Sequence, residues 1–432
     1  MKRFLSGLVL GAALALALAG ATAPRKAAAQ HPRADPAPAA PEPGPERLEP
    51  RDLQVRVTPQ MTRYSNTVHA LYFAGTVFNA LVLLLFLRSG LSARLRDLAE
   101  RKGKNGLARA YIYYPLYSLL SALLHLPLRL YAGYFLPHQY GLSTQTLGGW
   151  TLDSAKSLGI SAALAPPVIA LLYWTLQRSP RRWWVGFWLA SIPLLVFSIL
   201  LAPILIDPLF NKFQPLRDER LRDRILTLAR RAGIEESRVL EQDASRRTRA
   251  LNAYVTGLGG SARIVLWDTL LQRMDEEETL FVMAHEMGHY VEGHVPLLLA
   301  ASIGGTLAIL LLVHAGGHAL LRVNGERWGV RGLDDLAGLP AILLLVLLLN
   351  FFGSPVESAV SRTLEERADA FGLRLTGNGR AAASAFIKLS EQNLSHPSPP
   401  PFIEFWMFSH PPLQRRIEKA QAWDAAHEGR SR

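Results

Sequence analysis

Cysteine is absent from all 432 residues of the sequence. The chain therefore forms no disulfide and offers no thiolate to a metal, so a zinc ion would have to be held by histidine and carboxylate side chains. Charge is sparse as well: charged residues make up 19% of the chain, whereas hydrophobic residues make up 49% and the mean hydropathy is +0.13. A balance this apolar predicts membrane-spanning segments rather than a wholly soluble protein.

Acidic residues are fewer than basic ones, and the formal net charge is +12. The basic residues fall mainly between apolar runs and do not form one patch with interleaved aromatic residues, which argues against a nucleic-acid partner. Cationic loops beside apolar segments fit the anionic inner surface of a membrane. The lipid bilayer is therefore the expected partner.

Residues 1–29 have the layout of a secretory signal. Lys2 and Arg3 precede an apolar core, and small residues ending at 27–29 offer a cleavage site. The apolar run is also long enough for an uncleaved N-terminal anchor, so both alternatives stay open. Residues 30–62 are rich in proline and alanine and predict an extended linker.

Six apolar stretches follow, each close to the ~20 residues that a membrane-spanning helix needs. They lie at 67–87, 111–135, 158–176, 183–206, 295–315 and 336–353. The first four predict a membrane domain at 63–206 with four transmembrane helices, and the last two predict a second membrane segment at 295–353. A polar insert at 207–294 and a polar tail at 354–432 are distant in sequence, so they must meet in space to form one site.

The polar insert contains signals for both helices and strands. The stretch RLRDRILTLARRAGI predicts a basic amphipathic helix that ends at Gly233. The stretch LNAYVTGLGGSARIVLWDTLL predicts a β-hairpin, because β-branched and aromatic residues flank a glycine-rich turn. Next, MDEEETLFVMAHEMGHY predicts a helix with Asp275 as N-cap and Glu278 completing a capping box.

This last helix carries the order H-E-x-x-H at His285, Glu286 and His289. Helix positions i and i+4 lie above one another on one face, so both imidazoles can coordinate one metal ion from the same side. Glu286 then lies beside the metal, where it can act as general base on a water molecule. A catalytic zinc takes a third protein ligand and keeps its fourth position for water.

The third ligand is expected on a nearby acidic or histidine side chain. The candidates are His294, Glu357, Glu365, Glu366 and Asp369. On a straight helix His294 would lie about 140° round from His289 and point away. Residues 358–375 predict a second helix on which Glu365 and Asp369 share a face, so that one can ligate while the other fixes a histidine. Periodicity does not distinguish Glu365 from Glu366.

Several segments together resemble the type I CAAX prenyl endopeptidases, multi-pass membrane zinc metalloproteases of the gluzincin type. They are HEMGHY, SRTLEERADAF, NAYVTG…ARIVLWDTLL, PILIDPLFNKFQPL and SHPPLQRRI, and HQYGLSTQTLGGWTLDSAKS is similar to a family loop between membrane helices. The resemblance covers about residues 111–420. It implies one zinc ion per chain held by His285, His289 and Glu365, with Asp369 as the supporting carboxylate.

The resemblance also implies substrate-contacting residues. It assigns Asn252 to substrate binding, and a strand edge that starts there can pair with an extended peptide. It assigns His410 and Arg416 to catalysis, and both side chains can donate hydrogen bonds to a developing oxyanion or a substrate carbonyl. His396 is a competing histidine, but no arginine follows it at the same spacing.

The predicted fold is mainly α: a multi-pass transmembrane helical bundle with a zincin-like metalloprotease domain that contains a small β-hairpin or sheet. The predicted function is zinc-dependent endoproteolysis of peptide or protein substrates, membrane-associated or prenylated, with CAAX-type processing implied by the resemblance. The alternatives are quality-control cleavage of membrane or exported proteins and a non-catalytic zinc-fold chaperone or sensor. A transporter is disfavoured, because no pair of broken helices occurs in matching halves.

The short loops carry unequal charge. Loops 88–110 and 177–182 are basic, whereas loop 136–157 has only Lys156, and the positive-inside rule places the two basic loops in the cytoplasm. With residues 31–65 exported, the count of spans leaves the insert and the tail outside. An extracytoplasmic site is therefore favoured, although the eukaryotic members of the family work on the cytosolic side.

Overall fold

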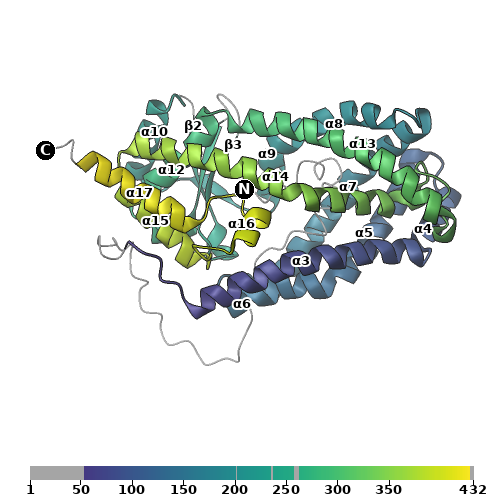
Figure 1. Ribbon diagram of the computed structural model, residues 1–432, viewed down its shortest axis with the longest axis horizontal. Coiled ribbons are helices and arrows are strands. Elements are labelled where there is room, and N and C mark those ends of the chain that lie inside the picture. Colours follow the sequence, from purple (N-terminus) through teal and green to yellow (C-terminus); the bar gives the residue numbers. More distant parts are fainter. Residues whose placement is uncertain (1–52, 201, 235–236, 257–261, 429–432) are drawn as a thin grey trace.

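The computed structural model describes residues 53–200, 202–234, 237–256 and 262–428 (Figure 1). The predicted signal peptide or anchor at 1–29 and most of the predicted linker at 30–62 lie outside the described residues. The molecule is elongated, with long helices running along it and the sheet and shorter helices gathered at one end. The mainly helical class that the sequence predicts is confirmed.

The long helices have the length and composition of membrane spans. Their bounds are α3 Pro59–Arg88, α5 Gly106–Leu130, α7 Leu147–Arg178, α8 Trp183–Leu200, α13 His294–Trp328 and α14 Leu339–Thr376. Among the described residues five helices are long and apolar enough to cross a membrane, and the shorter apolar helix Trp183–Ser198 corresponds to the fourth predicted span. The protein is a multi-pass integral membrane protein.

Helix α14 continues without a break through the predicted boundary at residue 353. It has 38 residues and is therefore about 57 Å long at 1.5 Å per residue. The hydrocarbon core of a bilayer is only about 30 Å thick. The C-terminal part of α14, which carries the acidic residues singled out above, thus extends beyond the apolar span in the same continuous helix.

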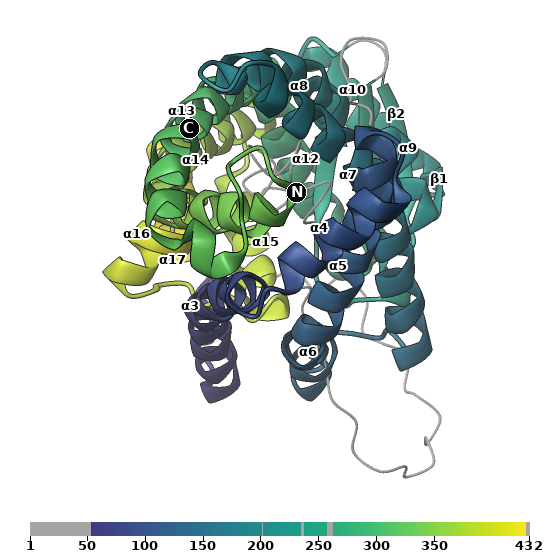
Figure 2. The same cartoon turned by 90° about the vertical axis from the view of Figure 1, so that its right-hand side faces the viewer.

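One end of the bundle is closed by helix α4, Leu91–Lys102. Ser92 donates a hydrogen bond to the backbone oxygen of Ala337 at 2.7 Å, and buried Arg96 forms an ion pair with Asp335. Gln177, at the end of α7, donates a hydrogen bond to the backbone oxygen of Asp334, in the loop between α13 and α14. Both basic loops therefore lie at this end, opposite the end that holds the strands (Figure 1), and Figure 2 views the molecule from the end where α4 lies.

The other end gathers four segments that are distant in sequence. The segment before α3 contacts the tail, because Arg56 N donates a hydrogen bond to Glu391 Oε1 at 2.8 Å. The tail contacts the insert, because Asn393 Oδ1 accepts a hydrogen bond from Leu251 N at 2.9 Å. The loop before α7 joins the insert from Thr144 to the backbone oxygen of Ser245. The insert and the tail thus meet in space, as one shared site requires.

A four-stranded mixed sheet lies at this end. Its strands are β1 Phe213–Pro215, β2 Ser237–Gln242, β3 Ala253–Thr256 and β4 Ala262–Trp267, in the order β1-β2-β4-β3. Strands β3 and β4 pair antiparallel with Ala253 opposite Leu266, which confirms the predicted hairpin. Strand β2 pairs parallel with β4, a pairing that the sequence analysis did not predict.

Shorter helices complete the described part of the fold. They are α6 Leu136–Gln139, α9 Ala202–Leu205, α10 Glu219–Arg231, α11 Asp268–Arg273, α12 Glu276–Val291, α15 Gly379–Gln392, α16 Pro401–Met407 and α17 Leu413–Glu428. Helix α10 ends as predicted, with Gly233 at a positive φ of 79°. Its buried apolar face includes Leu221, Ile225 and Leu228, each stabilising the fold by about 1.5–3 kcal/mol.

Candidate active site

Helix α12 begins at a capping box, as the sequence predicts. The side chain of Asp275 accepts from Glu278 N at 2.9 Å, and Glu278 Oε2 accepts from Asp275 N at 2.7 Å. Glu278 is buried and also pairs with Lys388 of α15 at 2.7 Å. The start of the helix is thus held both locally and by the tail, which fixes the side chains that follow.

Two turns further along α12, the side chains of His285 and His289 meet Glu365 of α14. The two imidazole Nε2 atoms lie 3.2 Å apart, and each lies 3.3 Å from one oxygen of the Glu365 carboxylate. All three side chains are buried, and their ligand atoms lie within 4.8 Å of one another. The structure therefore brings together the three residues that the resemblance implies as metal ligands.

The separations between these atoms fit a tetrahedral ion. Zinc binds histidine nitrogen and carboxylate oxygen at about 2.0–2.2 Å, so neighbouring ligands of a tetrahedral site lie about 3.3 Å apart. The separation of 3.2 Å between the two Nε2 atoms matches this value, and each imidazole lies 3.3 Å from a different oxygen of the Glu365 carboxylate. Two neutral imidazoles and one carboxylate are also a donor set that zinc prefers.

The structure separates Glu365 from the other acidic candidates. The neighbouring carboxylate of Glu366 is exposed and pairs with Lys419 at 3.1 Å. Glu357 lies two turns before Glu365 on the same helix and is not part of the three-residue group. The choice that periodicity left open thus falls on Glu365 by geometry.

Two glycines let α12 and α14 approach closely. A Cβ on Gly288 would lie 3.2 Å from the Cα of Ala368, and a Cβ on Gly372 would lie 3.2 Å from the backbone nitrogen of His285. Both contacts are tighter than ordinary van der Waals packing. Larger residues would separate the helices, and the carboxylate and imidazoles would no longer share one small volume.

Asp369 and Arg416 lie behind His285. The Nδ1 atom of His285 lies 2.8 Å from Asp369 Oδ1, and Arg416 donates from Nε to Asp369 Oδ2 at 2.8 Å. Arg416 is buried, with its guanidinium over the ring of Phe386 at 4.1 Å. Its donors are thus directed at Asp369, whereas the sequence analysis directs them at a substrate carbonyl.

His410 lies at the open side of the cluster. Its Nε2 lies 3.4 Å from Glu365 Oε2, and its side chain is 43% exposed. The competing His396 instead bonds through its backbone nitrogen to Ser65 Oγ of α3 at 3.2 Å. His410 is therefore the histidine of the tail that combines contact with the cluster and access to solvent.

The sequence analysis missed the position of His294. Helix α12 ends at Val291, Gly293 adopts a positive φ of 67°, and α13 begins at His294. The chain turns there, so His294 Nδ1 lies 2.7 Å from His289 Nδ1 in a buried contact. The expectation that His294 points away is wrong, because it assumed a straight helix. Glycine at a helix C-terminus was the available signal.

Asn252 immediately precedes β3, which is an edge strand of the sheet. Its backbone oxygen accepts from Trp267 N at 3.2 Å, so the residue continues the pairing with β4. Strand β3 also packs against α12, the helix that bears the histidines. Asn252 therefore lies at the start of an edge strand that packs against the histidine-bearing helix.

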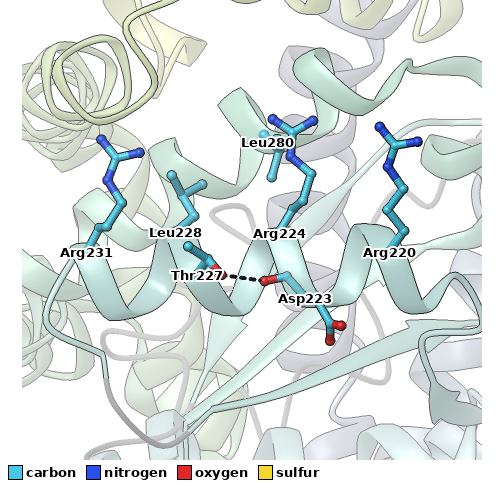
Figure 3. Close-up of a pocket in the computed structure, with 7 residues that line it drawn as sticks. All are labelled: Arg220, Asp223, Arg224, Thr227, Leu228, Arg231 and Leu280. Carbon is cyan, nitrogen blue, oxygen red and sulfur yellow. Dashed lines mark hydrogen bonds between the residues drawn. The ribbon is translucent and has the colours of Figure 1, made fainter.

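A cavity of about 600 Å³ lies between α10 and α12. Figure 3 shows Arg220, Arg224 and Arg231 projecting from one side of α10 into it. The hydrogen bond to Glu276 and the neighbouring Glu277 raise the pKa of Arg224 above its usual range, and Arg224 forms ion pairs with both carboxylates. The cavity is lined by none of the residues that form the metal cluster.

Comparisons with protein families agree with this arrangement. Residues 215–424 match the model of peptidase family M48. Residues 45–212 match the model described as CAAX prenyl protease N-terminal, five membrane helices. The two matches together span the membrane helices, the sheet and the metal cluster.

Individual proteins match over most of the chain. An uncharacterized metalloprotease of Bacillus subtilis, YhfN, is 36% identical, with 85% of this chain and 86% of that protein covered. CAAX prenyl protease 1 of Saccharomyces cerevisiae is 30% identical over 72% of each chain. The crystal structure of S. mikatae Ste24p superposes with a TM-score of 0.74 at 26% identity, covering 84% of this chain and 88% of that one.

Proposed function

The chain belongs to peptidase family M48 as a membrane metalloprotease of the CAAX prenyl protease group, and we propose that it is a zinc-dependent endopeptidase with one ion per chain. The observation that carries the proposal is the convergence of His285, His289 and Glu365, whose ligand atoms lie within 4.8 Å of one another. Their separations and donor types fit zinc.

A bound zinc ion would polarise the scissile carbonyl and lower the pKa of a water molecule toward ~7. Glu286 follows His285 on α12 and is half-buried beside the cluster. In the proposed reaction its carboxylate accepts the proton of the attacking water and delivers it to the leaving amine. His410, partly exposed beside Glu365, donates a hydrogen bond to the carbonyl oxygen as charge develops there.

The surrounding residues hold the two imidazoles in one tautomer. A histidine that offers Nε2 to a metal keeps its proton on Nδ1, which then donates to a partner. Asp369 accepts in this way from His285, and Arg416 holds the Asp369 carboxylate in place. In this proposal His294 accepts at Nδ1 in the same way from His289, which requires that His294 carry its own proton on Nε2.

The substrate in this proposal is an extended peptide that pairs along the edge strand β3. Asn252 lies at the start of that edge, and edge strands bind extended peptides through main-chain hydrogen bonds. The curated relatives named CAAX prenyl protease 1 support prenylated C-terminal CAAX proteins as the substrate class. We also propose that residues 207–294 and 354–432 form the catalytic segments, and that residues 63–206 and 295–353 form the membrane segments.

A second substrate class follows from the distribution of charge. The basic loops 88–110 and 177–182 lie at the end of the bundle opposite the metal cluster. By the positive-inside rule this arrangement favours an extracytoplasmic active site, with the N-terminal segment exported by a signal peptide or anchor. Membrane or exported polypeptides, cleaved for quality control, are then the substrates.

Fusion of a compartment-specific reporter after residue 432 tests the orientation. We expect activity of a reporter that works outside the cytoplasm. A fusion that is active only in the cytoplasm would overturn the extracytoplasmic site and leave CAAX processing as the substrate class.

Zinc analysis of the purified protein, with peptide cleavage before and after chelation, tests the chemistry. We expect one zinc per chain and cleavage that chelation abolishes and added zinc restores. Glu286→Gln should keep zinc but lose activity by at least ~10²-fold, because it removes the general base and not a ligand. Cleavage at the wild-type rate by this variant would refute the assigned role of Glu286.

A further inference from the structure

Helix α16, Pro401–Met407, carries an apolar surface that the active site does not use. Its sequence PFIEFWM holds three aromatic residues in seven. Phe402 and Phe405 are 58% and 53% exposed. These two side chains are three residues apart and so share one side of the helix.

Ring contacts of α16 reach two membrane-spanning helices, and Phe402 takes part in one of them although it is 58% exposed. Phe402 stacks on Phe73 of α3 with ring centroids 5.7 Å apart, and Trp406 packs on Phe351 of α14 at 5.0 Å. Phe73 and Phe351 both belong to apolar stretches with the length of a membrane span. Helix α16 therefore lies against the ends of these spans nearest the catalytic segments (Figure 1).

The apolar surface continues from α16 onto α14. Phe352 and Val356, one turn apart, are 65% and 68% exposed. Phe352 also lies 6.5 Å from Trp406, ring centroid to ring centroid. The exposed aromatic side of α16 is thus continuous with the lipid-facing surface of a span, whose neighbour in a cell is the bilayer.

Polar contacts attach α16 to the catalytic tail. Glu404 pairs with Arg415 at 3.3 Å, and Arg362 of α14 donates to the backbone oxygens of Glu404 and Phe408 at 3.1 and 2.8 Å. His410 follows three residues after the helix ends. One side of α16 is therefore bound to the protein, and this attachment leads directly to His410.

We propose that α16 is an interfacial helix whose Phe402 and Phe405 insert into the bilayer on the side of the catalytic segments. Aromatic side chains concentrate at this depth because their rings tolerate the boundary between headgroups and acyl chains. A helix lying there buries its apolar face about 5–10 Å into the boundary. Inserted in this way, α16 holds the segment that carries His410 at the membrane surface.

Site-directed spin labelling of the full chain in phospholipid nanodiscs tests this proposal, and the absence of native cysteine makes every label unique. A nitroxide on Phe405→Cys should collide readily with oxygen, which partitions into lipid, and poorly with a water-soluble nickel chelate. A label on Arg220→Cys, where the native side chain is 81% exposed on α10, provides the water-facing control. Phe402→Cys is a second reporter of the same surface if the first variant does not fold.

Nickel accessibility at Phe405 and Phe402 equal to that at Arg220 would overturn the proposal, because the surface would then face water. Low accessibility to both oxygen and nickel, with spin–spin broadening, would also overturn it, because a second copy of the chain would then cover the surface. The readout needs neither zinc nor cleavage. Failure of the proposed chemistry would therefore leave the test of α16 intact.

Discussion

Two neighbouring helices each carry a pair of histidines four residues apart. His285 and His289 lie on α12, and His314 and His318 lie on α13, with ring centroids 4.8 Å apart in both pairs. The planes are nearly perpendicular in each, at 85° and 89°. By local geometry alone, the two pairs are equivalent.

Their surroundings differ. The first pair faces the buried carboxylate of Glu365, whereas His314 of the second pair accepts a hydrogen bond from Trp183 Nε1 at 3.0 Å. Within the described residues, the three side chains close enough together to hold one metal ion are His285 and His289, which form the first pair, and Glu365. The spacing of histidines on a helix therefore supplies half a site, and a carboxylate from another helix completes it.

The largest effect is expected from removing that carboxylate. Glu365→Gln should empty the metal site and lower peptide cleavage by at least ~10²-fold, because the pair on α12 would then resemble the pair on α13. The matched control is Glu366→Gln, which removes only an exposed pair with Lys419. Zinc content and cleavage rate measure both variants. Loss of zinc from the control, with retention in Glu365→Gln, would reverse the assignment.

The next effect concerns the support of His285. Asp369→Asn should lower zinc affinity about 10–100-fold, because the supporting carboxylate orients the imidazole and raises its basicity. Competition with a chromogenic chelator measures the change, and Asp223→Asn, an exposed carboxylate on α10, is the control. An unchanged affinity in Asp369→Asn would mean that Asp369 and Arg416 serve the fold alone.

A smaller effect is expected at His289, whose partner is an imidazole and not a carboxylate. His294→Leu should lower zinc affinity about tenfold, since hydrogen bonds to a neutral acceptor are roughly half as strong as those to a carboxylate. His294→Asn should restore most of the affinity, because its amide oxygen can accept from His289 Nδ1. Equal loss in both variants would indicate a packing role instead.

The smallest effect is expected at the second pair. His314→Gln combined with His318→Gln should leave zinc content and cleavage unchanged, because no carboxylate of the described residues completes a site there. Purification of the double variant with metal analysis checks this. Loss of a full equivalent of zinc would show that the two pairs are not as different as their surroundings indicate.

Local features were predictable from the sequence because they depend on neighbouring residues. The capping box at Asp275 and Glu278, the hairpin of β3 and β4, and the end of α10 at Gly233 are all confirmed. Helix spacing also predicted that His285 and His289 share a face. It did not distinguish Glu365 from Glu366, because spacing along α14 does not show which side of that helix faces the histidines.

Features that depend on distant segments were not predictable in this way. The hydrogen bond from Arg416 to Asp369 joins two helices through residues that are 47 positions apart in the sequence. The parallel pairing of β2 with β4 depends on the path of the chain between these two strands. The contact of His294 with His289 needs the turn at Gly293 and the new helix that follows. Each of these contacts requires knowledge of how separate segments of the chain are placed in space.

X-ray diffraction from zinc-loaded crystals, with data collected on both sides of the zinc absorption edge, tests the central claim most directly. We predict a single anomalous peak per chain, about 2.0–2.2 Å from His285 Nε2, His289 Nε2 and an oxygen of Glu365. A peak at the pair on α13 in its place, or a zinc-loaded crystal with no peak between α12 and α14, would contradict the claim.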